Sequence, residues 1–201
     1  MTLGNNAFAS CSKLQNIEIN SDLLTLGNSA FQSYSNLLNL EINCNFTTIG
    51  HNAFQVCSNL EDIEINSNYT TIGSNAFLNC KNLANLSISA DILLLGDLSF
   101  STCSSMQAVE LTADNIKIGN NAFQSCSSLQ NLTIEGNITT IGVNAFTPCV
   151  NLETISIEGI EITIEKTAFQ SCTNLQELII NKKDDNIADT NSTDSDTDTI
   201  S

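Results

Sequence analysis

Apolar and small side chains return to the same place every 23 residues along most of the chain. A small residue precedes each repeated phenylalanine, seven of the eight units carry cysteine three positions after it, and an apolar residue follows at six. The phenylalanines, with no insertion between copies, are Phe8, Phe31, Phe54, Phe77, Phe100, Phe123, Phe146 and Phe169. Such a fixed period predicts a solenoid of stacked units, because one unit alone cannot bury its apolar side.

The stretch after the small residue of each unit has helical spacing. Ala122, Cys126 and Leu129 are separated by four and three residues, which predicts one buried face of a short helix. Asn121 directly precedes this stretch and is placed to cap the free amides of the first helical turn. We therefore expect one short helix in each unit.

The rest of each unit has the pattern of extended chain. Residues 131–134 alternate polar and apolar side chains, which predicts a strand with one buried side. A second extended segment follows at 138–142 and ends at Gly142. We expect this glycine to adopt a turn conformation that other residues resist.

The repeat also resembles that of a known family. The stretch "TTIGSNAFLNCKNLANLSI" at 70–88 is similar to the "IGxxAFxxCxxLxxIxI" unit of BspA-type leucine-rich repeat proteins, and the resemblance covers about residues 1–181. It implies an α/β repeat fold: a curved, right-handed leucine-rich-repeat solenoid with a parallel β-sheet on one face and short helices on the other. It also implies a surface protein of bacteria or protozoan parasites that mediates adhesion or recognition. Tyr34 in place of cysteine and Glu165 in place of glycine depart from the pattern.

Two segments of different composition make up the chain. Residues 1–181 form one predicted solenoid domain of eight units. Residues 182–201 hold six aspartates and two lysines with few apolar side chains, a composition that predicts a disordered acidic tail. The sequence begins in the middle of a unit and has no evident capping unit, so we expect a fragment of a longer protein.

The charge balance narrows the choice of partners. The formal net charge is −16, and removing the tail's six aspartates and two lysines leaves 16 acids and four lysines, or −12. Nucleic-acid binding needs a basic surface, so we expect no nucleic-acid partner, and anionic membranes are disfavoured for the same reason. No apolar run reaches the ~20 residues of a membrane span, and no signal segment opens the chain. The resemblance implies a cell-surface or extracellular location, and a cytoplasmic one is the alternative.

The repeated cysteines, Cys126 among them, could be catalytic or could only fill space in the core. A catalytic cysteine needs a base, and His51 is the only histidine for seven equivalent thiols, so we expect buried, reduced thiols that fill space. A disulfide ladder is the alternative, disfavoured because parallel side chains bridge poorly. We expect no cofactor and no metal, since metal-ligand spacings are absent. Cys44 lies outside the repeat position, and we expect it near the surface as the fastest thiol to react.

The outward positions of the predicted strands form columns of amide and acidic side chains. Glu18, Glu41 and Glu64 are expected to stack about 4.8 Å apart, and each neighbouring pair repels by about 1 kcal/mol even in water. The candidate partner face comprises Asn16, Glu18, Asn20, Asn39, Glu41, Asn43, Asp62, Glu64, Asn66, Asn85 and Glu110. Three interpretations stay open: a solvated polar face, a docking surface for a basic partner or divalent cation, and a glycan site.

Six Asn-x-Ser/Thr sequons also occur, and they offer a way to discriminate between these interpretations. They begin at Asn45, Asn68, Asn85, Asn131, Asn137 and Asn191. In a secreted eukaryotic protein they are candidate glycan sites. Two of them, Asn85 and Asn131, lie in the first outward column, which begins with Asn16, Asn39 and Asp62. A glycan there would cover the candidate partner face.

The sequence thus favours a non-catalytic module for protein–protein or glycan recognition and adhesion, in a surface-exposed or secreted protein. An intracellular leucine-rich-repeat scaffold that docks a partner protein is the alternative. An enzyme is not expected, because the acidic columns are regular and nothing in them separates a general acid from a base.

Overall fold

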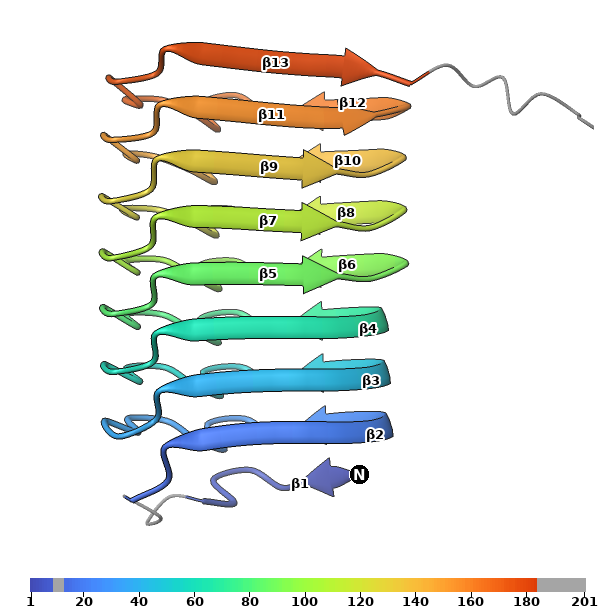
Figure 1. The fold of residues 1–201 in the computed structure, drawn as a ribbon, viewed down its shortest axis with the longest axis vertical. Coiled ribbons are helices and arrows are strands. Elements are labelled where there is room, and N and C mark those ends of the chain that lie inside the picture. The colour runs from blue at the N-terminus through green and yellow to red at the C-terminus, as the bar shows by residue number, and fades with distance from the viewer. Residues whose placement is uncertain (9–12, 184–201) are drawn as a thin grey trace, which may run out of the picture.

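The computed structural model describes residues 1–8 and 13–183, which form a coil of stacked turns (Figure 1). Every paired strand is parallel to its neighbour, and each register step is 23 residues, as in Glu18↔Glu41↔Glu64. The prediction of a parallel-stranded solenoid is therefore confirmed.

The strands form two ladders that meet at a corner. The front ladder consists of the first parts of β2 (Asn16–Leu26), β3 (Asn39–Ile49) and β4 (Asp62–Ile72), with β5 (Asn85–Ser89), β7 (Ala108–Thr112), β9 (Asn131–Glu135), β11 (Thr154–Gly159) and β13 (Glu177–Lys182). The rear ladder consists of β1 (Thr2–Leu3), the last parts of β2–β4, β6 (Ile92–Leu95), β8 (Asn115–Ile118), β10 (Ile138–Ile141) and β12 (Glu161–Ile164). Turns join the rear strand of each unit to the front strand of the next.

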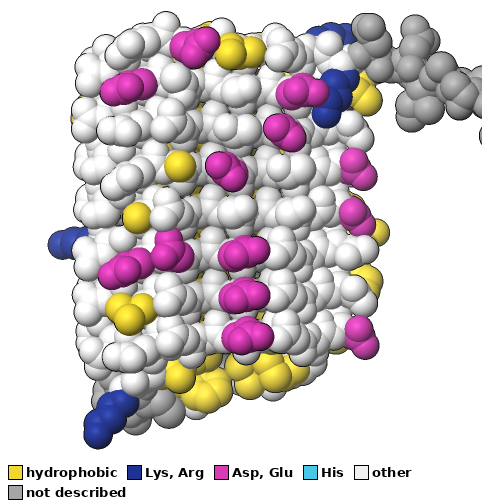
Figure 2. Space-filling model, viewed as in Figure 1, with side chains coloured by type: hydrophobic (Ala, Val, Ile, Leu, Met, Phe, Trp, Pro, Cys, Tyr) yellow, Lys and Arg dark blue, Asp and Glu magenta, His cyan; other side chains and the backbone are white. Residues whose placement is uncertain are grey.

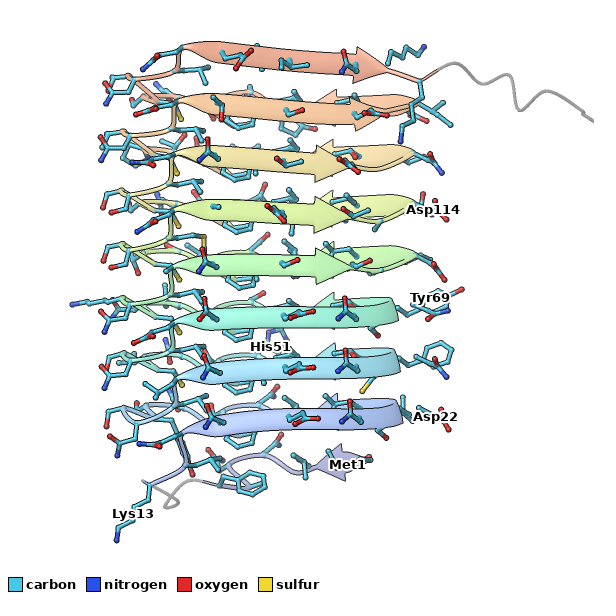
Figure 3. All side chains as sticks on the ribbon, viewed as in Figure 1. Met1, Lys13, Asp22, His51, Tyr69 and Asp114 are labelled. Carbon is cyan, nitrogen blue, oxygen red and sulfur yellow. The ribbon has the colours of Figure 1, made fainter. Side chains whose placement is uncertain are left out.

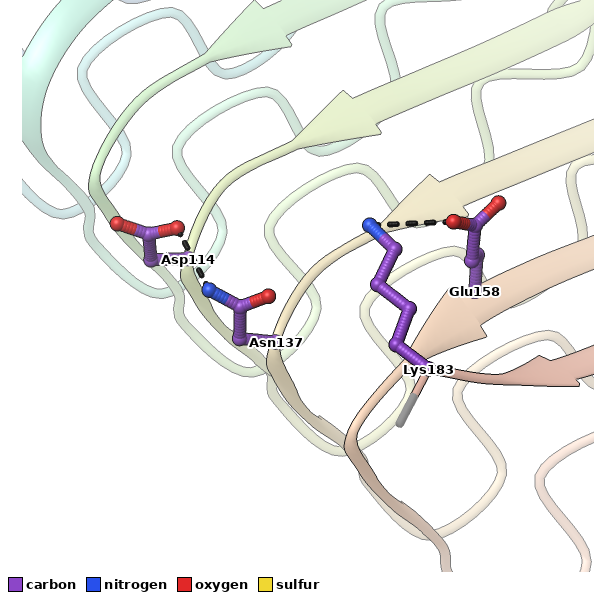
Figure 4. A network of polar contacts seen from close by, with 4 residues as sticks. All are labelled: Asp114, Asn137, Glu158 and Lys183. Carbon is purple, nitrogen blue, oxygen red and sulfur yellow. Dashed lines mark hydrogen bonds and ion pairs between the residues drawn. The ribbon is translucent and has the colours of Figure 1, made fainter. Parts of the chain in front are cut away.

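The division into a solenoid at 1–181 and a tail at 182–201 stays a prediction. Strand β13 includes Lys182, and the ammonium of Lys183 lies 3.2 Å from the Glu158 carboxylate (Figure 4). Residues 184–201 lie outside the described part of the chain.

A continuous stack of phenylalanine rings fills the core. Neighbouring rings from Phe8 to Phe169 are nearly parallel, with centroids 4.7 to 5.3 Å apart. The rings from Phe31 to Phe146 are at most 2% exposed, as predicted, whereas Phe8 and Phe169 at the two ends are partly buried. Inward leucine and isoleucine side chains of both ladders enclose the stack.

The expectation of short helices is wrong: no helix occurs among residues 1–8 and 13–183. Around Phe54, alternate amides bond in two directions. The N–H groups of Ala53, Gln55 and Cys57 donate to carbonyls three residues back, which closes successive β-turns. The N–H groups of Asn52, Phe54 and Val56 donate instead to carbonyls of the next unit, at 2.7 to 3.2 Å. Bonds between units therefore replace the i→i−4 bonds of a helix.

The residue before each small residue is also not a helix cap. Asn52, Asn75 and Asn121 have φ of 54° to 58°, in the left-handed region. Asn52 and Asn75 are each the third residue of a turn that the next residue's N–H closes. Asparagine tolerates this conformation better than most residues, which explains its recurrence there. Leu98 holds the same position at φ 58° without that advantage.

The repeated glycines are required for a different reason from the one expected. No described glycine has a positive φ. A Cβ built on Gly73 would instead lie 2.8 Å from the backbone of Gly50 and His51 in the preceding unit. The units approach so closely at Gly73 that a Cβ would require the preceding backbone to shift, although Glu165 holds the equivalent position in the last unit. Gly4, in the first unit, would meet nothing within 4 Å.

Candidate functional site

The candidate partner face lies on the front ladder and faces solvent along its whole length (Figure 2). Ten of its eleven residues are exposed, and Asn43 is partly buried. Strands β2, β3 and β4 bring Glu18, Glu41 and Glu64 into direct register, and they appear as a vertical acidic column in Figure 2. Glu110 lies two strands beyond Glu64, with Ser87 between them.

Asparagine side chains hold this acidic column in place. On each strand the Nδ2 group two residues after the glutamate donates to its Oε1, at 2.8 Å from Asn20, 2.9 Å from Asn43 and 3.0 Å from Asn66. The same Nδ2 groups of Asn43 and Asn66 also donate to Oδ1 of the preceding asparagine, at 3.1 Å. Both N–H bonds of these amides are thus used inside the protein.

The first outward column is bonded in the same direction. The Asn39 amide donates to Asn16 at 2.8 Å, and the Asn85 amide donates to the Asp62 carboxylate at 2.7 Å. These bonds between units fix the side chains that border the glutamates. The polar side chains of β2–β5 therefore form three bonded groups: the three glutamates with Asn20, Asn43 and Asn66, the pair Asn16 and Asn39, and the pair Asp62 and Asn85.

The carboxylates keep acceptor capacity toward solvent. Within the described part of the chain, no protein group donates to Oε2 of Glu18, Glu41 or Glu64. Three like charges at strand spacing, about 4.8 Å apart, repel, and the neutral amides do not remove that repulsion. The arrangement can thus accept hydrogen bonds from a row of cationic donors, which would also relieve the repulsion.

Among residues 1–8 and 13–183, no group of three or more His, Cys, Asp and Glu side chains has the geometry of a metal site. The same part of the chain contains no helix with the length and apolar character that a membrane crossing requires.

The cysteine column lies inside the solenoid, behind the turns. Cys57, Cys80, Cys103, Cys126 and Cys149 are fully buried free thiols, as expected for packing residues. Each Sγ donates to the carbonyl of the phenylalanine in the preceding unit, at 3.2 to 3.3 Å. The carbonyls of Phe54, Phe77 and Phe123 also accept the backbone N–H of the cysteine in their own unit, so there the thiol of the next unit uses the second lone pair. Cys11 lies outside the described residues.

Burial also makes these thiols unreactive. It raises the pKa of Cys126 well above the usual value, and it raises the pKa of Cys149 to about 12. The thiolate is the nucleophilic form, so these groups stay protonated and inert at neutral pH. His51 is not paired with them: its Nδ1 accepts the backbone N–H of Ser74 at 3.0 Å, which is a structural role.

The expectation that Cys44 lies near the surface is wrong, and its rank as the fastest thiol to react stays a prediction. This side chain is only 7% exposed, because the corner between the two ladders turns it inward, with Sγ 4.0 Å from the Ile19 carbonyl oxygen. Cys172 is instead the more accessible thiol among those described, being only partly buried in the last unit.

A second surface feature, not predicted from the sequence, lies on the rear ladder just past the corner. The rings of Phe46 and Tyr69 are stacked, with centroids 5.1 Å apart, yet 49% and 45% exposed. Leu23 precedes them in register and is also 49% exposed. The 23-residue period aligns all three positions and could have revealed this strip. Figure 3 shows Tyr69 on the same edge as the corner residues Asp22 and Asp114.

Comparison with known proteins places this fold in context. No curated protein matches the sequence. The solved structures that are similar include a leucine-rich repeat protein from Bacteroides ovatus, with 22% identity over 90% of this chain and a TM-score of 0.43. A leucine-rich cell surface protein from Faecalibacterium prausnitzii is similar at 17% identity over 90% of this chain, with a TM-score of 0.36. The chain spans 59% of the former protein and 77% of the latter.

The repeated sequence identifies the family to which this chain belongs. The BspA-type leucine-rich repeat region matches residues 1–107 and 94–195, in six copies. These matches cover nearly the whole chain, and they agree with the 23-residue register of the strands. The chain therefore belongs to the BspA-type leucine-rich repeat family.

Proposed function

We propose that this chain is a non-catalytic recognition module that docks a basic protein segment on the front ladder of β2–β4. The observation that carries the proposal is the column of Glu18, Glu41 and Glu64, in which each carboxylate is positioned by an asparagine and presents a free oxygen. A face evolved only for solubility needs charge, but it has no need of like charges in register. The module would belong to a surface-exposed or secreted protein, the usual setting of this family.

A protein partner is favoured over a glycan by the state of the amides. Sugar hydroxyls are commonly bound by side-chain amides that are free to donate and accept. Here both Nδ2 hydrogens of Asn43 and Asn66 are already used within the network. The remaining acceptor capacity is on the carboxylates, which suits lysine or arginine donors.

The spacing of the column also suits one shape of partner. The glutamates repeat about every 4.8 Å, so the outer two are about 10 Å apart. Residues i, i+3 and i+7 of an α-helix are separated along its axis by about 4.5 and 10.5 Å. A basic helix parallel to the solenoid axis would therefore place one cation near each glutamate, whereas same-face residues of an extended strand recur at about 6.7 Å.

The test uses two synthetic alanine-based helical peptides of equal lysine content. One has its lysines at i, i+3 and i+7 on one face, and the other distributes them around the helix. We expect the full chain to bind the first more tightly, with an association rate that falls as salt is added. Replacing Glu18, Glu41 and Glu64 together by glutamine should abolish the preference, because the acceptor oxygens remain but the charge is lost.

The matched control removes the same charge elsewhere, through Asp97→Asn, Glu161→Gln and Glu165→Gln, on the rear ladder and its turns. It should leave the preference between peptides intact. Equal weakening by both triple variants would show that net charge alone drives binding, and the docking face would then be abandoned. The intracellular scaffold is the second candidate, supported by the free thiols of the cysteine column.

A further inference from the structure

In each unit the residue at the corner between the front and rear ladders, such as Asp22 or Asn45, varies together with the residue two positions later, such as Leu24 or Thr47. Seven units have both positions within the described residues. Threonine occupies the later position in three of them, and in these the corner residue is asparagine: Asn45 with Thr47, Asn68 with Thr70, and Asn137 with Thr139. In the other four units this position holds leucine or isoleucine, buried except for the partly buried Ile162, and the corner is never asparagine.

These threonines do not serve the packing of the core. Thr47, Thr70 and Thr139 are 2%, 1% and 0% exposed, and among the described residues none of their hydroxyls has a hydrogen-bond partner. Burying an unpartnered hydroxyl destabilises a fold. Leu24 and Leu93 fill the same position in other units without that penalty. The hydroxyl therefore adds no stability at these three positions that leucine would lack.

We propose that Asn45, Asn68 and Asn137 carry N-linked oligosaccharides, and that the buried threonines are kept as the third residues of their Asn-x-Thr sequons. The donor would be an oligosaccharide linked to a lipid pyrophosphate, in the secretory pathway. Asparagine Nδ2 attacks the anomeric carbon, the new C–N bond replaces the C–O bond to pyrophosphate, and the lipid pyrophosphate leaves with the electron pair. Nδ2 gives one proton to a base and keeps the other.

The corner accommodates this modification. The Asn45 amide donates to Asp22 at 3.2 Å, and the Asn137 amide donates to Asp114 at 2.9 Å (Figure 4). Each bond uses only one of the two Nδ2 hydrogens, and a glycosylated amide keeps one hydrogen with which it can donate. Asn45 and Asn68 are exposed and Asn137 is partly buried.

The middle residue of each corner sequon supports the same conclusion. Phe46, Tyr69 and Ile138 are large apolar side chains that are 49%, 45% and 47% exposed. A sugar chain on the preceding asparagine would cover each of them. Attachment at the corner would also leave the front ladder free, so the inference does not depend on the proposed docking face.

Two sequons on the front ladder lack these features. The third residues there are Ser87, which is exposed, and Thr133, which is partly buried. Their hydroxyls bring no burial penalty, so their presence needs no explanation through glycosylation. Asn191 lies outside the described residues.

Burial of the threonines also determines whether glycosylation comes before or after folding. The transferring enzyme must reach both the asparagine amide and the sequon hydroxyl, but the hydroxyls of Thr47, Thr70 and Thr139 are inaccessible once the units have stacked. Modification must therefore precede the folding of the corner.

The test expresses the full chain behind a secretory leader in eukaryotic cells and maps glycopeptides by mass spectrometry. We expect glycans at all three corner asparagines. Thr47→Val and Asn45→Gln should each remove only the glycan at Asn45, while Thr47→Ser should retain it. The same Thr47→Val change, made in unglycosylated protein from bacterial cytosol, should raise the urea midpoint of unfolding, because it removes only the unpartnered hydroxyl.

Thr70→Val and Thr139→Val are the parallel variants at the other two corners. The proposal is overturned if any of the three asparagines is unmodified in the secreted protein. It is equally overturned if the valine variants unfold at lower urea than the wild type, since the hydroxyls would then have a structural role.

Discussion

Replacing one phenylalanine in the middle of the ring stack should destabilise the solenoid far more than replacing one at its end. Phe100 is fully buried and stacks on Phe77 and Phe123, with centroids 4.9 and 5.3 Å away. Phe100→Ala therefore loses a buried ring and two stacking contacts, and we expect a loss of about 4 kcal/mol in unfolding free energy. Phe169 is partly buried and stacks only on Phe146 among the described rings, so Phe169→Ala should lose about 1 to 2 kcal/mol.

Urea unfolding followed by far-UV circular dichroism measures the difference. With a slope of about 2 kcal/mol per molar urea, Phe100→Ala should lower the midpoint by about 2 M and Phe169→Ala by less than about 1 M. Equal shifts would refute the reasoning, because they would mean that the stack contributes no more at its centre than at its end. Phe100→Leu, which refills much of the volume without an aromatic ring, separates ring stacking from cavity formation.

Two other predictions concern the glycines and the thiols. Gly73→Ala should lower the urea midpoint, since its Cβ would lie 2.8 Å from the preceding unit's backbone and overpacking costs about 1 to 3 kcal/mol, whereas Gly4→Ala should be neutral. Above pH ~8.5 the thiols of the unfolded chain lose protons while the buried thiols keep theirs, so stability should fall as pH rises. For Cys149, whose pKa is about 12, the fall should extend to about pH 12 at about 1.4 kcal/mol per pH unit. Cys149→Ala should make the measured slope shallower, and an unchanged slope would contradict the assignment.

The period of the sequence was sufficient to predict the strands, their register and the phenylalanine column. It was not sufficient for the stretch around Phe54, because successive β-turns also place inward side chains four and three residues apart. Only the partners of the amides distinguish the two, and those of Asn52 and Phe54 lie 22 residues further along the chain. The repeated glycines were recognised in the sequence, but the predicted turn conformation was the wrong reason for them. Close approach between units requires them, and the local sequence does not reveal which backbone segments will lie in contact.

The outward columns of the candidate partner face could be predicted because strand pairing fixes which side chains align. The support given by Asn43 to Glu41 could not, because it depends on side-chain rotamers. The inward turn of Cys44 depends on where the chain bends between the two ladders, which the alternating pattern does not specify.

The direction of the hydrogen bonds between units has a mechanical consequence. Strands lie across the long axis of the coil, so their hydrogen bonds run along that axis, and β1 and β13 lie at opposite ends (Figure 1). Tension applied between these ends pulls the bonds of one layer apart at a time instead of shearing all of them together. Each layer that peels away releases 23 residues, or about 80 Å of extended chain, in place of about 5 Å of stack. Under load this protein should therefore lengthen in nearly equal steps at low force, and act as an extensible tether rather than a rigid rod.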